Sequence, residues 1–334
     1  MIETPYRAEA SRYDAGMLYR RAGRSGVRLP ALSLGMWHNF GGEQPFSRMQ
    51  QMVHFAFDRG VTHFDLANNY GPPNGAAEAN FGRLVERSLR PYRDELFVAT
   101  KAGYDMWPGP YGNWGSRKYL VSSLDQSLRR MKLDYVDVFY SHRYDPETPL
   151  EETLQTLVDL VRAGKALYAG ISRYPLEAAR FAFRYLSERD VPCLVFQDKY
   201  NLFDRQVENS GVLKLAAGSG AGFVAFSPLA QGLLTDRYLD GIPADSRMAA
   251  GGSLRREILT EALLNRIRGL NGIARQRGQT LAQMALAWLV NDERVTSVLV
   301  GASSTAQLAD NLRALENTAF TADELLAIDR LSKA

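Results

Sequence analysis

The sequence predicts an α/β fold in which eight parallel strands close into a (β/α)8 TIM barrel. Short β-branched or apolar runs alternate with longer helical patterns, and the alternation occurs eight times along the 334 residues. Strand followed by helix is typical of parallel βαβ units, which form either an open doubly wound sheet or a barrel. No Pro-, Gly- or Ser-rich linker divides the chain, and polar residues cluster just after the strand ends, so the barrel is favoured.

The elements follow one another in a regular order. The predicted strands lie at 32–34, 62–66, 96–100, 136–140, 166–171, 194–197, 223–226 and 297–300. The predicted helices lie at 46–59, 76–88, 118–131, 150–163, 175–188, 208–217, 256–290 and 304–314. Ser304 and Gln307 have the spacing of a capping box at the start of the last helix. Two long connections, 101–116 and 229–255, are expected to be functional, since long loops in compact domains usually are.

The N-terminal part is expected to be an extension, 1–16, ahead of one barrel domain over 17–334. Residues 17–34 have the pattern of a hairpin that turns at Arg24, Ser25 and Gly26 and plugs the bottom of the barrel, with 32–34 running into it. Residues 1–25 contain no apolar signal-peptide core, and no span of eighteen apolar residues occurs later. We therefore expect a soluble, cytoplasmic protein with no membrane partner.

Composition excludes several classes of protein. Apolar residues make up 46% and charged residues 23% of the chain, which suits a large packed core and excludes disorder, collagen and coiled coil. The formal charge of +3 is spread without a basic block, so no nucleic-acid partner is expected. The one cysteine, Cys193, lies in an apolar stretch and is expected to be a buried side chain in a reducing compartment.

The signatures of several common sites are missing. The chain contains no P-loop, no H-E-x-x-H, no C-x-x-C and no G-x-S-x-G motif. The glycines at 218, 220 and 222 lack the Rossmann spacing and precede a strand. No metal site is expected, because no pair with metal-ligand spacing is formed by the four histidines, His38, His54, His63 and His142.

Titratable residues gather at the carboxyl ends of successive strands. Asp65 and Tyr70 follow the second strand, Lys101 the third and His142 the fourth, so all four are expected at one mouth of the barrel. A tyrosine beside a buried lysine is a coherent acid, because a neighbouring cation lowers the phenol pKa from about 10. A lone Asp or Lys at a strand end is more often part of an ordinary ion pair, and His63 is expected to be a core histidine with its hydrogen bonds satisfied.

Together these residues resemble the catalytic tetrad of the aldo-keto reductases. The similarity extends from residue 17 to the C-terminus and includes the strings FDLANNYGPPNGAAE, TKAGYDMWPGPYG, FYSHR, YNLFDR, FSPLAQGLLT and SVLVGASSTAQLADN. Within that family the sequence is most similar to bacterial L-glyceraldehyde 3-phosphate reductases, and next to the β subunits of potassium channels.

The resemblance implies a barrel that binds NADPH or NADP+ without a Rossmann domain. Ser172, Arg173 and Gln197 match positions beside the nicotinamide carboxamide, and Phe226 matches an aromatic residue that stacks on the nicotinamide ring. The pyrophosphate loop would comprise Ser227, Pro228, Leu229, Gln231 and Gly232, with Arg237 in place of a more usual lysine. The remaining implied cofactor contacts are Arg247 and Ser303 at the 2′-phosphate, Gln307 and Asn311 near the adenosine, and Trp37, Asp65 and Gly301. A helix that starts at Ser304 offers free N–H groups to a phosphate. Without the resemblance, Arg237 and Arg247 would be interpreted as solvated charges of a loop, although an arginine can bind a phosphate with two hydrogen bonds.

By the same resemblance the chain is an NADPH-dependent reductase of small aldehydes, such as L-glyceraldehyde 3-phosphate or methylglyoxal. Tyr70 would donate the proton, Lys101 would lower the pKa of Tyr70, Asp65 would hold Lys101, and His142 would orient the carbonyl. The substrate would meet Trp37, Tyr70, Trp107, Trp114 and His142. Arg143 could serve a substrate phosphate.

Two other functions stay open at this point. The pair Ser172-Arg173 replaces the Ser-Asn of many members and is the form seen in channel β subunits, which suggests an NADP(H)-sensing regulatory subunit. Those subunits usually lack the tetrad histidine, so His142 favours the enzyme. A reductase of aromatic or steroid carbonyls is the other alternative. Relatives often assemble as tetramers or larger, so a homo-oligomer is possible.

Overall fold

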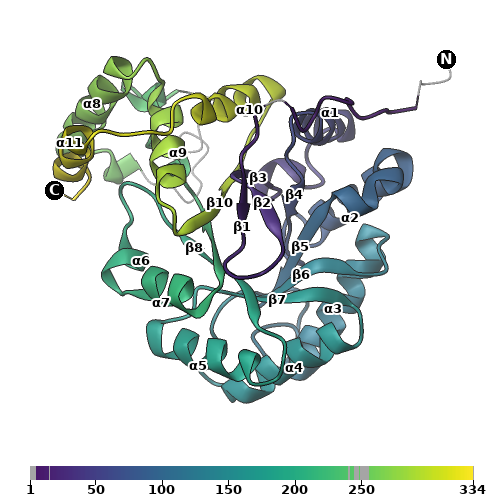
Figure 1. The fold of residues 1–334 in the computed structure, drawn as a ribbon. Helices are drawn as coiled ribbons and strands as arrows, with labels where there is room; N and C mark the ends of the chain where they lie inside the picture. Colours follow the sequence, from purple (N-terminus) through teal and green to yellow (C-terminus); the bar gives the residue numbers. More distant parts are fainter. Residues whose placement is uncertain (1–4, 15, 240, 244–247, 249–255, 334) are drawn as a thin grey trace.

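The eight predicted strands close into a barrel, which confirms the predicted fold class. We describe a computed structural model of the chain, for all residues except 1–4, 15, 240, 244–247, 249–255 and 334. All neighbouring barrel strands are parallel, in the order β10-β3-β4-β5-β6-β7-β8-β9 (Figure 1). The strands are β3 (Leu32–Gly35), β4 (His63–Asp65), β5 (Phe97–Ala102), β6 (Val136–Ser141), β7 (Ala166–Ser172), β8 (Cys193–Lys199), β9 (Gly222–Phe226) and β10 (Val295–Val300).

The predicted hairpin lies across the bottom of the barrel. Strand β1 (Tyr19–Arg21) pairs antiparallel with β2 (Arg28–Pro30), and Figure 1 shows the pair in front of the barrel axis. Ala22 and Leu29 are fully buried in one cluster with barrel side chains such as Ala99, Val138 and Val224. The hairpin therefore closes this end, and a ligand must enter from the other.

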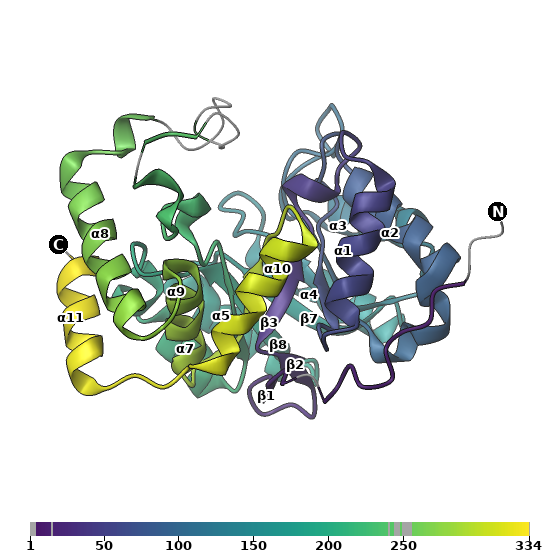
Figure 2. The ribbon, with the colours of Figure 1, turned by 90° about the horizontal axis from the view of Figure 1, so that it is seen from above.

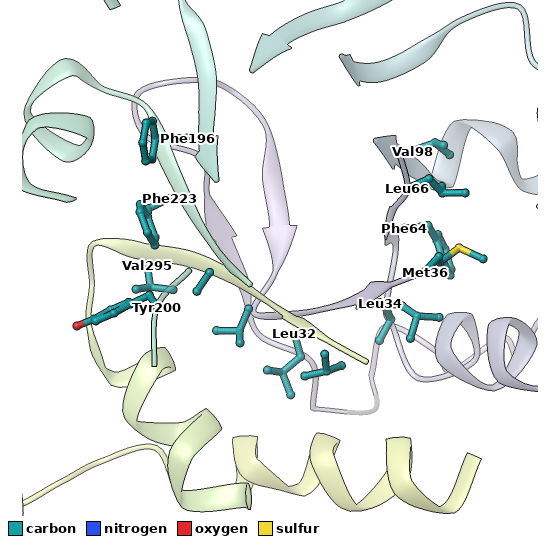
Figure 3. Packing of buried hydrophobic residues seen from close by; sticks show 14 of the residues in the cluster. Leu32, Leu34, Met36, Phe64, Leu66, Val98, Phe196, Tyr200, Phe223 and Val295 are labelled. Atoms are coloured by element: carbon teal, nitrogen blue, oxygen red, sulfur yellow. The ribbon is translucent and has the colours of Figure 1, made fainter. Parts of the chain in front are cut away.

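Helices surround the barrel and follow the predicted order. They are α1 (Phe46–Phe57), α2 (Ala76–Leu84), α3 (Arg117–Met131), α4 (Leu150–Arg162), α5 (Leu176–Ser187), α6 (Gln206–Asn209), α7 (Val212–Ser219), α8 (Glu261–Gln276), α9 (Leu281–Asn291), α10 (Thr305–Leu312) and α11 (Ala322–Ser332). Apolar side chains of the strands, among them Leu34 and Phe64, pack with the helices (Figure 3). This packing between strands and helices holds in place the strand ends that carry the polar residues.

Two predicted helices are split in the structure, and one further helix was not predicted. The region 208–217 is split by Gly211 and the region 256–290 by Gly278, both with positive φ, 81° and 69°, that ends a helix. Thr280 and Gln283 then form a capping box that starts α9. The last helix, α11, was not predicted, and it packs beside α8 at the edge of the molecule (Figure 2).

The capping box predicted at Ser304 is only half formed. The Ser304 side chain accepts from the Gln307 backbone N–H. The Gln307 side chain, however, accepts from the backbone N–H and the hydroxyl of Ser303, at 2.8 and 3.1 Å. The reciprocal bond to Ser304 is lost because Ser303 offers two donors to the same oxygen.

His63 is buried inside the barrel, but the prediction that its hydrogen bonds are satisfied was wrong. Ser297 Oγ donates to the Pro30 carbonyl, so Ser33 Oγ must donate to Ser297 and accept from His63 Nδ1. Nε2 is then the unprotonated nitrogen, and it has no partner. Burial lowers the pKa of His63 to about 4, so the ring is neutral at pH 7. Cys193 is buried as predicted, and burial raises the pKa of its thiol to about 12.

Candidate active site

A buried ion pair lies at the open end of the barrel. Alternation along β4 turns Phe64 toward the helices and Asp65 into the barrel, where Lys101 of β5 reaches it. Lys101 Nζ donates to Asp65 Oδ2 and to the Leu66 carbonyl, both at 2.6 Å. Gln197 Nε2, from β8, donates to Asp65 Oδ1 at 2.9 Å. Both members of the pair are almost fully buried, so the Lys101 ammonium group is held in one position.

Tyr70 lies over this pair, in the turn that leads from β4 to α2. The Lys101 Nζ atom is 4.9 Å from the centre of the Tyr70 ring. Trp37 stacks on the Tyr70 ring with centroids 5.8 Å apart, and the His142 ring meets it edge-on at 6.0 Å. The Tyr70 hydroxyl makes no hydrogen bond to any of the residues that the structure describes. A substrate oxygen can therefore take that place.

The pKa of Tyr70 is raised well above its usual value, contrary to the prediction. Burial is the main cause, and electrostatic interactions with the Asp65 carboxylate and with Tyr104 add to it. The Lys101 ammonium, which donates to Asp65 and Leu66 and lies over the ring, does not outweigh the effect of burial. Tyr70 is thus a neutral phenol that keeps its proton at pH 7.

His142 follows β6, and its imidazole is uncharged at this site. Only 8% of its surface is exposed, and Nδ1 is buried without a partner. Burial lowers its pKa well below 6.5, and the cations Lys101, Arg173 and Arg143 lower the pKa further. A Cβ on Gly103 would lie 2.9 Å from the His142 Cβ, so only glycine fits beside it.

Strained backbone borders the site on the β7 and β9 side. Ser172 ends β7, and its hydroxyl is buried without a partner. Arg173, Ser227 and Gln231 have positive φ of 55°, 53° and 60°, and Gly232 has 102°. Such conformations cost free energy in residues other than glycine and concentrate where ligands bind. Phe226, half-buried, ends β9 directly before this segment.

A cleft of about 420 Å³ continues from this segment toward α10. Four residues predicted to contact the cofactor line it, namely Leu229, Arg237, Gln307 and Asn311. The Asn311 Nδ2 group is buried and has no hydrogen-bond partner. An orphaned donor here and the orphaned Ser172 hydroxyl are what a polar ligand would satisfy, so these residues fit an elongated, polar cofactor.

The other predicted contacts are distributed around this region. Gly301 and Ser303 are exposed between β10 and α10, and Pro228 is buried in the strained segment. Trp107 packs on Tyr119 of α3, with ring centroids 5.2 Å apart, whereas Trp114 stacks on Arg143. Arg247 lies outside the described residues.

Tyr104 is a site residue that the sequence analysis missed. Its ring meets the His142 ring edge-on at 4.7 Å, and its hydroxyl accepts from Arg173 at 3.4 Å. The only signal was its place in the long loop, three residues after Lys101. Among the described residues no group of three His, Cys, Asp or Glu side chains could hold a metal, and no helix is long and apolar enough to cross a membrane.

Known proteins are similar to this chain over nearly its whole length. The model of the Aldo/keto reductase family matches residues 31–333. Two proteins of Escherichia coli named L-glyceraldehyde 3-phosphate reductase are 57% and 56% identical over 327 residues, which is 97% of this chain and 94% of each relative. A probable voltage-gated potassium channel subunit beta from Oryza sativa subsp. japonica is 38% identical over 90% of this chain and 92% of its own. The crystal structure of a thermostable aldo-keto reductase with the inhibitor epalrestat has a TM-score of 0.73 at 30% identity, covering 94% of this chain and 100% of the other.

Proposed function

The chain belongs to the aldo/keto reductase family and is an oxidoreductase, and we propose that it reduces small aldehydes with NADPH. The proposed substrates are L-glyceraldehyde 3-phosphate and methylglyoxal, and the proposed general acid is Tyr70. The observation that carries the proposal is the Tyr70 hydroxyl, which has no described partner and lies beside a neutral histidine and a buried Lys–Asp pair.

The cofactor would be held by the residues of the strained segment and the cleft. When bound, the reduced nicotinamide supplies a hydride to the carbonyl carbon. Ser172 has the free hydroxyl, Phe226 the ring and Asn311 the free amide that such a ligand needs. Arg247 and Ser303 are proposed to contact the 2′-phosphate that distinguishes NADPH from NADH.

The residues at the mouth would handle the proton and the carbonyl oxygen. The raised pKa of Tyr70 keeps the phenol protonated until negative charge develops on the substrate oxygen. The Lys101 ammonium, fixed by Asp65 and Leu66, would then stabilise the phenolate that remains. His142, being neutral, would donate a hydrogen bond to the same oxygen and orient the carbonyl.

A screen of initial rates with NADPH tests the proposal directly. Methylglyoxal, L-glyceraldehyde 3-phosphate and a nitrobenzaldehyde distinguish a reductase of short aldehydes from one of aromatic carbonyls. Turnover of nitrobenzaldehyde alone would contradict the proposed substrate class. NADPH binding without turnover of any of the three would contradict the proposed activity and favour a cofactor-sensing subunit.

We expect His142→Asn to lower kcat by about 10- to 100-fold. The asparagine keeps a hydrogen-bond donor but loses the shape of the imidazole, so the loss lies within or below the usual range for acid–base groups. His54→Asn, on the outer helix α1, is the matched control and should leave kcat unchanged. Because the pKa of His142 lies well below 6.5, the wild-type rate should show no step near that pH. An unchanged rate in His142→Asn would mean that the histidine is structural.

Cofactor choice should depend on Arg247 and not on Asn311. Arg247→Ala is expected to weaken NADPH binding by about 2 to 3 kcal/mol and to leave NADH binding nearly unchanged, since NADH lacks the 2′-phosphate. Asn311→Ala should weaken both cofactors equally, by about 1 kcal/mol, because the adenosine is common to them. Fluorescence titrations of both cofactors measure the four changes. Equal losses for NADPH and NADH in Arg247→Ala would show that this arginine only orders its loop.

A further inference from the structure

Arg143 is a rigidly held cation next to the proposed active site. Its guanidinium carbon lies 3.7 Å from the centre of the Trp114 ring and 4.2 Å from the centre of the Tyr104 ring. Nε donates to the Gly103 carbonyl at 2.8 Å, and one terminal nitrogen donates to Asn113 Oδ1 at 2.9 Å. Two aromatic contacts and two hydrogen bonds leave this half-buried side chain little freedom.

The charge of Arg143 is not neutralised by a direct ion pair. None of the described carboxylates lies within ion-pair distance of it. An acid of the same loop, Asp105, is kept apart from Arg143 by Asn113, whose amide nitrogen donates to Asp105 at 2.5 Å. The guanidinium has five N–H donors, and the two bonds to Gly103 and Asn113 leave the others for a ligand.

Arg143 is close enough to His142 for one small substrate to reach both. Tyr104 contacts both, and its ring centre is 4.7 Å from that of His142 and 4.2 Å from the Arg143 guanidinium carbon. The imidazole centre and that carbon are therefore no more than about 9 Å apart. A three-carbon aldehyde with a terminal phosphate spans roughly 6 Å from its bond lengths, and a hydrogen bond adds about 3 Å.

We propose that Arg143 binds the phosphate of a phosphorylated short aldehyde and so determines substrate specificity. The inference rests on the proposed function and deepens it, since it names the phosphorylated aldehyde as the preferred substrate. A planar guanidinium binds a phosphate with two parallel hydrogen bonds, whereas a neutral aldehyde has no anionic group to place against Arg143. Arg173, which donates to the Tyr104 hydroxyl, and Lys101 add positive potential at the same mouth.

The test compares two aldehydes that differ only in the phosphate, L-glyceraldehyde 3-phosphate and L-glyceraldehyde. Arg143→Met keeps an unbranched side chain against the Tyr104 and Trp114 rings but removes the charge. We expect kcat/KM for the phosphorylated aldehyde to fall by about 10- to 100-fold, mainly through KM, with a change of less than about 2-fold for L-glyceraldehyde. Arg143→Lys should lose less kcat/KM than Arg143→Met, because lysine keeps the positive charge but lacks the planar pair of N–H donors. Arg117→Met, at the exposed start of α3, also removes one arginine charge and should leave kcat/KM for both aldehydes unchanged.

An equal loss for both aldehydes would overturn the proposal and assign Arg143 to holding the loop 103–116. No loss for either would overturn it as well. Calorimetry with glycerol 3-phosphate and glycerol, on the full chain with saturating NADP+, provides a readout that does not depend on turnover. Binding of glycerol 3-phosphate that Arg143→Met abolishes supports the subsite, and equal binding by both proteins contradicts it. If the wild type reduced neither aldehyde, the proposed function would fail, while the calorimetry would still decide on the anion subsite.

Discussion

Tyr70→Phe is expected to abolish aldehyde reduction, with a loss in kcat of about 10²- to 10⁴-fold, the range that a general acid contributes. The substitution removes one oxygen atom and keeps the ring that stacks on Trp37 and lies over Lys101. The hydroxyl makes no hydrogen bond to the described residues, so its removal should leave the free energy of unfolding nearly unchanged. The measurement is kcat with methylglyoxal and with L-glyceraldehyde 3-phosphate under saturating NADPH.

The control for this variant lies in an exposed loop. Tyr111→Phe makes the same change in the loop after β5, on a side chain that is 56% exposed. It should keep full activity. NADPH affinity should be unchanged in both variants, because the proposed phosphate contacts lie in the cleft near α10. If Tyr70→Phe kept most of the wild-type rate, Tyr70 would not be the acid.

Lys101→Met is expected to be as damaging to activity and, unlike Tyr70→Phe, to destabilise the fold. It leaves the Asp65 carboxylate buried with Gln197 as its remaining side-chain partner. Breaking a buried ion pair from one side costs about 3 to 5 kcal/mol, because the remaining charge is desolvated. Denaturant unfolding should show this loss, and steady-state rates should show a kcat near that of Tyr70→Phe.

A double variant separates the two effects of Lys101. Asp65→Asn combined with Lys101→Met removes both charges, so most of the lost stability should return while activity stays absent. Lys118→Met, on an exposed position of α3, is the control for loss of a lysine charge and should change neither quantity. Recovery of activity in the double variant would show that Lys101 serves only to balance Asp65.

The parallel direction of the barrel strands explains why the sequence alone predicted that Asp65, Lys101 and His142 meet at one mouth. Parallel strands all point their carboxyl ends to one face, so residues after β4, β5 and β6 must meet there whatever their separation in the chain. Asp65, Lys101 and His142 each sit at such an end. The apolar alternation that defines the strands is local, and it therefore survives in the sequence as a readable pattern.

The tertiary structure determined the properties that depend on distances across the barrel. The Gln197 contact with Asp65 joins residues 132 positions apart, and no local pattern encodes it. The pKa of Tyr70 follows from how deeply the packing buries the ring and from where Lys101 directs its protons, so the sequence predicted its direction wrongly. The contacts of Tyr104 with His142 and Arg143 are likewise a result of loop packing. Periodicity along the chain determines which residues reach the mouth of the barrel, but desolvation and side-chain contacts arise only once distant segments are packed together.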